Sequence, residues 1–311
     1  MFKPILLSLF TVLGPHILCA AEPAPPITAA AFAPHFKHFV VGSQSGVFVY
    51  AWPQLKQQEK IETKLQHVHH LAFSPDKKIL CMVGGAPAEQ GAVEIVDWES
   101  RKLTRREVVA EEVLYGADWQ PEGKLALAAG DGRVLVGGGQ KQAWKELAGH
   151  AHGVLAVAWL ADGKTLVSAG LDQSLRVWDV ATGQPLRSLT NHTAPVLGLA
   201  VRPGDDQPRP MVASISSDRT VRLWQPTIGR MVRFLRLDRQ PLSLAWNDRG
   251  TQLAIGCTDG HVLSIDPDTL AILWDRPTLP GYVYTLLPAP GSEFLAAGLH
   301  GQLARIPSKN K

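Results

Sequence analysis

Two segments of this sequence repeat each other at a distance of 42 residues. The first begins with Gly149-His150 and the second with Asn191-His192. Each then carries Ser, Asp and Trp in the same order, as Ser168, Asp172 and Trp178 in the first segment and Ser214, Asp218 and Trp224 in the second. A repeat of about forty residues with His near its start and Trp late in it is typical of one propeller blade. The repeat therefore predicts a ring of small β-sheets.

The same phase can be followed along most of the chain. An aromatic or apolar residue stands near the end of the first strand of each predicted repeat at intervals of 40 to 46 residues, at Phe32, Phe73, Trp119, Trp159, Val201, Trp246 and Leu287. Turn residues such as those at 74–76 follow, and later strands such as 221–224 alternate apolar and polar residues. We interpret the segment 84–91 as a loop insertion in the second blade. The pattern predicts an all-β fold, a single seven-bladed β-propeller of four-stranded antiparallel blades over residues 22–311.

The two ends of the repeat region indicate how the ring closes. The last predicted strand ends at Ile306, so the seventh blade has no outer strand at the C-terminal end. The segment 21–26 before the first blade is rich in proline, which cannot donate ladder hydrogen bonds. We therefore expect a short seam between the seventh blade and the first.

The N-terminal segment is typical of a signal peptide. Lys3 is followed by the apolar stretch 5–18, and small residues stand at 19–21, where a signal peptidase would cut. The stretch is short for a membrane span and contains Pro15. We predict a cleaved signal peptide over residues 1–21 and an exported protein, periplasmic or secreted. Lipid attachment at Cys19 and retention without export are the alternatives.

Charge and cysteine content exclude some functions. The formal net charge of +3 is too small to indicate nucleic acid or an anionic membrane as the partner. After removal of residues 1–21, only Cys81 and Cys257 remain, and the repeat places them on different blades. We expect two separate buried thiols rather than a disulfide scaffold.

Ser168, His150 and Asp172 form a candidate Ser-His-Asp triad, and the second repeat offers a matching set, Ser214, His192 and Asp218. In a hydrolase, the histidine would deprotonate the serine while the aspartate orients the imidazole. The chain contains no Gly-x-Ser-x-Gly nucleophile elbow.

Gly149-His150 and Trp178-Asp179 match the two ends of the WD-repeat motif, and the blades resemble those of WD-repeat propellers over about residues 26–306. In this family the same residue types, with Trp178 or Trp224, form a hydrogen-bonded chain inside the blade. The resemblance implies that both sets are structural. It indicates the fold strongly and the function weakly.

Two further groups are candidates for a functional surface. His67, His69 and His152 are the possible ligands of a metal ion near the mouth of the central channel, although exposed histidines without a metal are the simpler interpretation. Tyr115, Tyr282 and Tyr284 are expected near the same mouth, either as exposed tyrosines of a partner surface or as packing residues that cap the channel.

The leading hypothesis is a non-catalytic protein-interaction scaffold that acts outside the cytoplasm. We expect a monomeric propeller with an unidentified protein or peptide partner, no cofactor, no nucleic acid and no membrane span. The alternative is a propeller enzyme with a metal or quinone cofactor in the central channel, which His67, His69 and His152 motivate.

Overall fold

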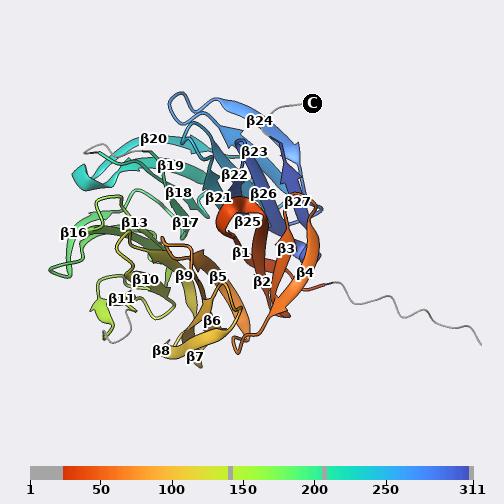
Figure 1. The fold of residues 1–311 in the computed structure, drawn as a ribbon. Helices are drawn as coiled ribbons and strands as arrows, with labels where there is room; N and C mark the ends of the chain where they lie inside the picture. Colours follow the sequence, from red (N-terminus) through yellow and green to blue (C-terminus); the bar gives the residue numbers. More distant parts are fainter. Residues whose placement is uncertain (1–23, 139–142, 205–208, 308–311) are drawn as a thin grey trace, which may run out of the picture.

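Seven antiparallel sheets follow one another along the chain and surround a central channel (Figure 1). The computed structural model describes residues 24–138, 143–204 and 209–307, so the predicted signal peptide at 1–21 lies outside the described residues. Each sheet consists of strands that are consecutive in the sequence. This arrangement confirms the predicted all-β seven-bladed propeller.

The first four blades each have four strands. They are β1 (Ile27–Phe32), β2 (His38–Ser43), β3 (Gly46–Ala51) and β4 (Lys56–Ile61); β5 (His67–Phe73), β6 (Ile79–Ala86), β7 (Gln90–Asp97) and β8 (Leu103–Ala110); β9 (Leu114–Trp119), β10 (Leu125–Ala129), β11 (Val134–Gly137) and β12 (Lys145–Leu147); and β13 (Val154–Trp159), β14 (Thr165–Gly170), β15 (Leu175–Asp179) and β16 (Gln184–Leu189).

The fifth and sixth blades also have four strands, and the seventh has three in the described part of the chain. They are β17 (Val196–Val201), β18 (Val212–Ser216), β19 (Thr220–Gln225) and β20 (Arg230–Arg236); β21 (Pro241–Trp246), β22 (Leu253–Cys257), β23 (His261–Ile265) and β24 (Ile272–Pro277); and β25 (Val283–Ala289), β26 (Glu293–Gly298) and β27 (Leu303–Ile306). The helices among these residues are three short 3-10 turns, η1 (Pro34–Phe36), η2 (Pro226–Ile228) and η3 (Leu299–Gly301). None of them is long and apolar enough to cross a membrane.

The core lies between neighbouring blades. In the fourth blade every residue of β14 is buried, whereas the outer strand β16 is exposed except for Leu189. Apolar clusters pack one sheet against the next, as between the first and second blades. Because both faces of the inner three strands are covered, their sequences are rich in Val, Leu and Ala. Cys81 and Cys257 are free thiols buried in two different blades.

The seam between the seventh and first blades is held by side-chain packing. Phe39 and Val41 of β2 pack with Leu295 and Ala297 of β26, and all four are buried. The ring of Phe39 is fully buried and stacks on Tyr50 with the ring centroids 5.4 Å apart. Among the described residues, no strand pairs with the outer edge of β27.

Two details of the sequence interpretation were wrong. The equivalent of Trp159 in the seventh blade is Pro288, one residue after Leu287, because Pro288 pairs with Phe294 as Trp159 pairs with Leu166. The segment 84–91 is mainly an extension of the β6–β7 hairpin rather than a loop insertion. Glycine permits this extension, because Gly85 has a φ of 142° and a Cβ atom there would lie 1.9 Å from the backbone oxygen of Gln90.

Candidate functional site

Every inner strand contains a β-bulge at the same position. In β13, Val154 pairs with Gly170 and Ala156 pairs with Ala169, so that Leu155 is the extra residue. The pairing of the other six inner strands shifts in the same way. A bulge re-aims a side chain relative to a regular strand. We call the seven extra residues the collar; they are Thr28, His69, Tyr115, Leu155, Leu197, Leu242 and Tyr284.

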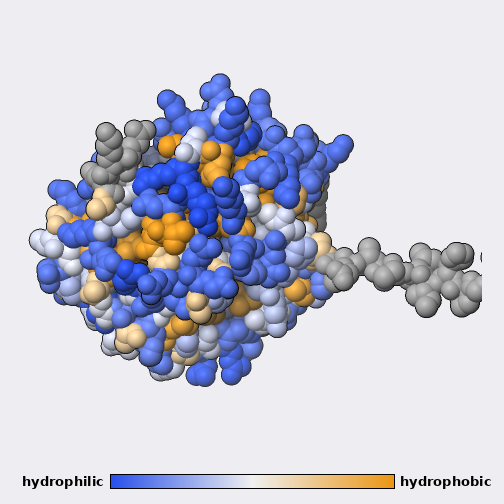
Figure 2. Space-filling view, turned by 90° about the horizontal axis from the view of Figure 1, so that it is seen from below, coloured by the Kyte–Doolittle hydropathy of each residue, from blue (hydrophilic) through white to orange (hydrophobic). Residues whose placement is uncertain are grey.

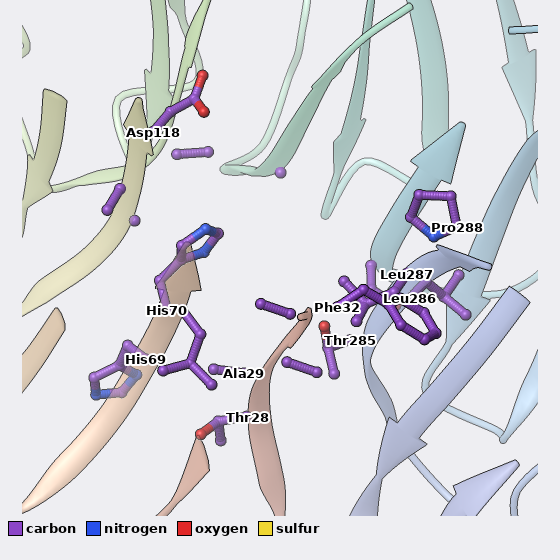
Figure 3. Close-up of a pocket in the computed structure, with 18 of the residues that line it drawn as sticks. Thr28, Ala29, Phe32, His69, His70, Asp118, Thr285, Leu286, Leu287 and Pro288 are labelled. Carbon is purple, nitrogen blue, oxygen red and sulfur yellow. The ribbon is translucent and has the colours of Figure 1, made fainter. Parts of the chain in front are cut away.

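The collar surrounds one mouth of the central channel. All seven collar residues line a cavity of about 980 Å³. Each is partly exposed, whereas the residue immediately before it is buried in its blade. In Figure 3, Thr28 and His69 lie on neighbouring inner strands at this cavity. The collar is therefore a composite site to which every blade contributes one side chain.

The structure places the predicted surface residues at different distances from this mouth. His69, Tyr115 and Tyr284 belong to the collar. His67 and Tyr282 flank it, with ring centroids 6.3 Å from His69 and 5.6 Å from Tyr284, respectively.

Sequence reasoning missed the other four collar residues, Thr28, Leu155, Leu197 and Leu242. A signal for them exists in the repeat, because in the first six blades the collar residue stands four positions before the end of its inner strand, and Tyr284 stands four positions before Pro288, the equivalent of Trp159. The bulge itself has no such signal in the alternation of apolar and polar residues.

The proposed metal ligands are not brought together. His69 lines the channel, while His152 lies in the loop before β13 with its side chain exposed. The described ranges contain no group of three or more His, Cys, Asp or Glu residues that could hold a metal ion. His67, His69 and His152 therefore do not form a ligand set, because their loop and strand positions separate them.

Burial shifts the pKa values of three side chains that line the channel. It lowers the pKa of His69 and of His70 to about 4, so both imidazoles are neutral at pH 7. Burial also raises the pKa of Asp118 to about 6, although the backbone N–H groups of Trp159 and Trp119 donate to this carboxylate at 2.7 and 2.9 Å. Figure 3 shows His70 and Asp118 on inner strands of neighbouring blades, and both residues line the channel cavity.

The low pKa of His70 predicts a pH dependence of stability. Between pH 6.5 and about 4 the unfolded chain binds this proton and the folded chain does not, so the free energy of unfolding falls as the pH falls through this window. We expect His70→Gln to reduce that fall. Urea unfolding of the original protein and of His70→Gln at pH 7.0 and pH 4.5 measures the fall in the free energy of unfolding. An equal loss of stability in the two proteins would contradict the assignment.

The fourth blade contains a hydrogen-bonded chain of four side chains, which we call a tetrad. The Trp178 indole donates to Ser168 Oγ at 2.8 Å, and Ser168 Oγ lies 2.7 Å from His150 Nε2. His150 Nδ1 lies 2.9 Å from an oxygen of Asp172. Although the hydrogen bond and charge of Asp172 raise the pKa of His150, burial outweighs them and lowers it.

The fifth blade contains a second tetrad. Trp224 Nε1 donates to Ser214 Oγ at 2.8 Å, Ser214 Oγ lies 2.8 Å from His192 Nε2, and His192 Nδ1 lies 2.8 Å from Asp218. Burial alone would raise the pKa of Asp218, but hydrogen bonds from Thr220 and His192 lower it to about 2.

The tetrads have no access to a substrate. Both serines and both tryptophans have 0% relative exposure. A nucleophile must contact its substrate, so Ser168 and Ser214 are in no position to attack one. Each tetrad instead satisfies buried polar groups within its own blade. Fold and site thus define a class of protein: a repeat-built β-propeller with polar tetrads inside two blades and a collared channel open at its mouth.

Parts of the sequence are similar to known WD-repeat proteins. The family model described as WD domain, G-beta repeat matches residues 141–179 and 183–225. The chain is 29% identical to THO complex subunit 3 of Arabidopsis thaliana, over 39% of each protein. It is 28% identical to Protein FIZZY-RELATED 3 of the same plant, over 52% of this chain and 34% of that protein.

A third relative covers more of the chain. WD repeat-containing protein srw1 of Schizosaccharomyces pombe is 26% identical over 70% of this chain and 39% of its own length. The chain thus matches between about a third and two fifths of the length of these relatives. Residues 141–179 and 183–225 thus match WD repeats, and they lie in a seven-bladed propeller, the architecture that the resemblance to WD-repeat propellers predicted.

Proposed function

We propose that this protein is a non-catalytic scaffold that binds a protein or peptide partner at the collar, and that it acts as a monomer outside the cytoplasm. The collar is the observation that carries the proposal, because seven partly exposed side chains converge on one cavity of about 980 Å³. Ligand sites are concave and commonly have volumes up to this size. The burial of both tetrads supports a role in binding rather than hydrolysis.

The comparisons support the same function. THO complex subunit 3 is by its name a component of a complex. On the side shown in Figure 2 the hydrophobic residues form small areas among hydrophilic ones, so this side offers less for a partner than the collar does. Export is supported by the sequence of residues 1–21, which has the charge, apolar stretch and small residues of a signal peptide.

Selection from a displayed library of random 12-residue peptides tests the binding function. The protein is immobilised and the recovered peptides are synthesised and measured by calorimetry. We expect peptides that bind one to one and compete with each other for a single site. Failure to recover any binding peptide would contradict the scaffold function.

A reporter fusion tests the compartment. Residues 1–24 are fused to alkaline phosphatase, an enzyme that is active only after export because it needs disulfides. We expect phosphatase activity and a new N-terminus at Glu22. The matched control replaces Leu6 and Leu7 by aspartate, which interrupts the apolar stretch and is expected to abolish the activity. An active control or an inactive fusion would contradict export.

A further inference from the structure

We propose that the collar recognises an uncharged peptide segment, which inserts one bulky apolar side chain against Leu155, Leu197 and Leu242 while its backbone carbonyls accept hydrogen bonds from the hydroxyls of Tyr115 and Tyr284. This inference rests on the proposed function and names the class of partner that the site accepts.

One side of the collar is apolar. Leu155, Leu197 and Leu242 occupy the bulge position of three consecutive blades, the fourth, fifth and sixth. Deeper in the channel, Leu199 and Leu244 line the same cavity. An apolar side chain that enters beside these leucines removes its own surface and theirs from water. We call the three collar leucines the leucine arc.

Tyrosines stand at both ends of the leucine arc. Tyr115 is the collar residue of the third blade and Tyr284 that of the seventh. Among the described residues, neither hydroxyl has a hydrogen-bond partner within the protein, and burial raises the pKa of both phenols, so they are protonated at neutral pH. A protonated phenol is a donor as well as an acceptor. Carbonyl groups of an extended peptide would supply the missing acceptors.

The remaining collar residues are Thr28 and His69. The hydroxyl of Thr28 already donates to the carbonyl oxygen of Val68 at 2.5 Å. The imidazole of His69 packs against Tyr115 with ring centroids 5.2 Å apart, and it is neutral at pH 7 because its pKa is about 4.

The collar therefore carries no charge at neutral pH. The charged side chains that line the cavity lie beyond it, with Asp118 near the end of β9 and with Asp76 and Lys77 in the β5–β6 turn. Burying a charge without a partner is costly, so a charged side chain is excluded from the mouth. An uncharged segment with an apolar anchor fits it.

Sequencing the peptides recovered in the library selection tests the inference. We expect most of them to share one Leu, Met, Phe or Trp flanked by uncharged residues. Leu197→Glu, which places a charge in the leucine arc, should weaken their binding at least about 30-fold, as expected for loss of a binding hot spot. The matched control is Leu186→Glu on the outer strand β16, where Leu186 is 53% exposed, and it should leave binding unchanged.

Milder variants keep the test valid if Leu197→Glu fails to fold. Leu242→Ser should weaken binding about 10-fold, and the double variant Tyr115→Phe with Tyr284→Phe also about 10-fold, since each loses uncharged contacts only. Two results would overturn the inference and leave the scaffold function standing. One is that the peptides bind Leu197→Glu or Leu242→Ser as tightly as the original protein. The other is that they share a charged motif without an apolar residue. Recovery of no peptide at all would contradict the scaffold function itself.

Discussion

Replacing Trp178 with alanine is expected to destabilise the propeller by about 3–5 kcal/mol, the range for removing a large aromatic side chain from a packed core. Trp178 has 0% relative exposure, and its indole donates to Ser168 at 2.8 Å. The loss therefore combines a cavity with a broken polar chain. Urea unfolding followed by far-ultraviolet circular dichroism gives the difference in the free energy of unfolding.

Two controls separate the cavity from the hydrogen bond. Trp178→Phe keeps most of the ring and should cost less, about 1–3 kcal/mol, because it mainly leaves the buried Ser168 hydroxyl without its donor. Trp274→Ala removes the same side-chain type from the outer strand β24, where Trp274 is only partly buried, and should cost less than Trp178→Ala. An equal cost for both tryptophans would contradict a structural role for the tetrad.

Replacing Phe39 with alanine is expected to cost a similar amount, about 3–5 kcal/mol, but to act on the seam. Phe39 is fully buried between the first and seventh blades, and among the described residues no strand of one of these blades pairs with a strand of the other. Native-state hydrogen exchange should show the amides of β1, β2 and β26 losing protection before those of the fourth blade.

Phe234 supplies the matched control for the seam. It is 51% exposed on the outer strand β20, so Phe234→Ala should cost less than about 1 kcal/mol and leave the order of exchange unchanged. A uniform rise of exchange over all seven blades after Phe39→Ala would contradict a locally weakened seam.

The fold could be predicted almost entirely from spacing. Blades are separate sheets of consecutive strands, so the period of 40 to 46 residues translates directly into the seven sheets. The wrong choice of Leu287 as the equivalent residue in the seventh blade also has a physical cause. Leu286, Leu287 and Pro288 are adjacent apolar residues. Only the pairing of Pro288 with Phe294 shows which of them corresponds to Trp159 of the fourth blade.

The collar could be predicted only in part. Tyr115, Tyr284 and His69 attract attention because of their side chains, whereas Leu155 resembles the buried Val154 beside it in the sequence. What separates these two residues is the bulge, which turns Leu155 toward the channel and leaves Val154 in the core. Period-two alternation assumes a regular strand and so assigns the wrong face at a bulge.

Within the described residues no strand is exchanged across the seam, and this has a mechanical consequence. Six of the seven junctions between blades are bridged by the polypeptide itself, whereas in the part of the chain that the structure describes the seventh and first blades meet through side-chain contacts. Tension applied between residues 24 and 307 would therefore load this one contact, while the covalent links hold the remaining blades in series. Under a stretching force the ring should first open between the seventh and first blades, and single blades should then unfold one after another.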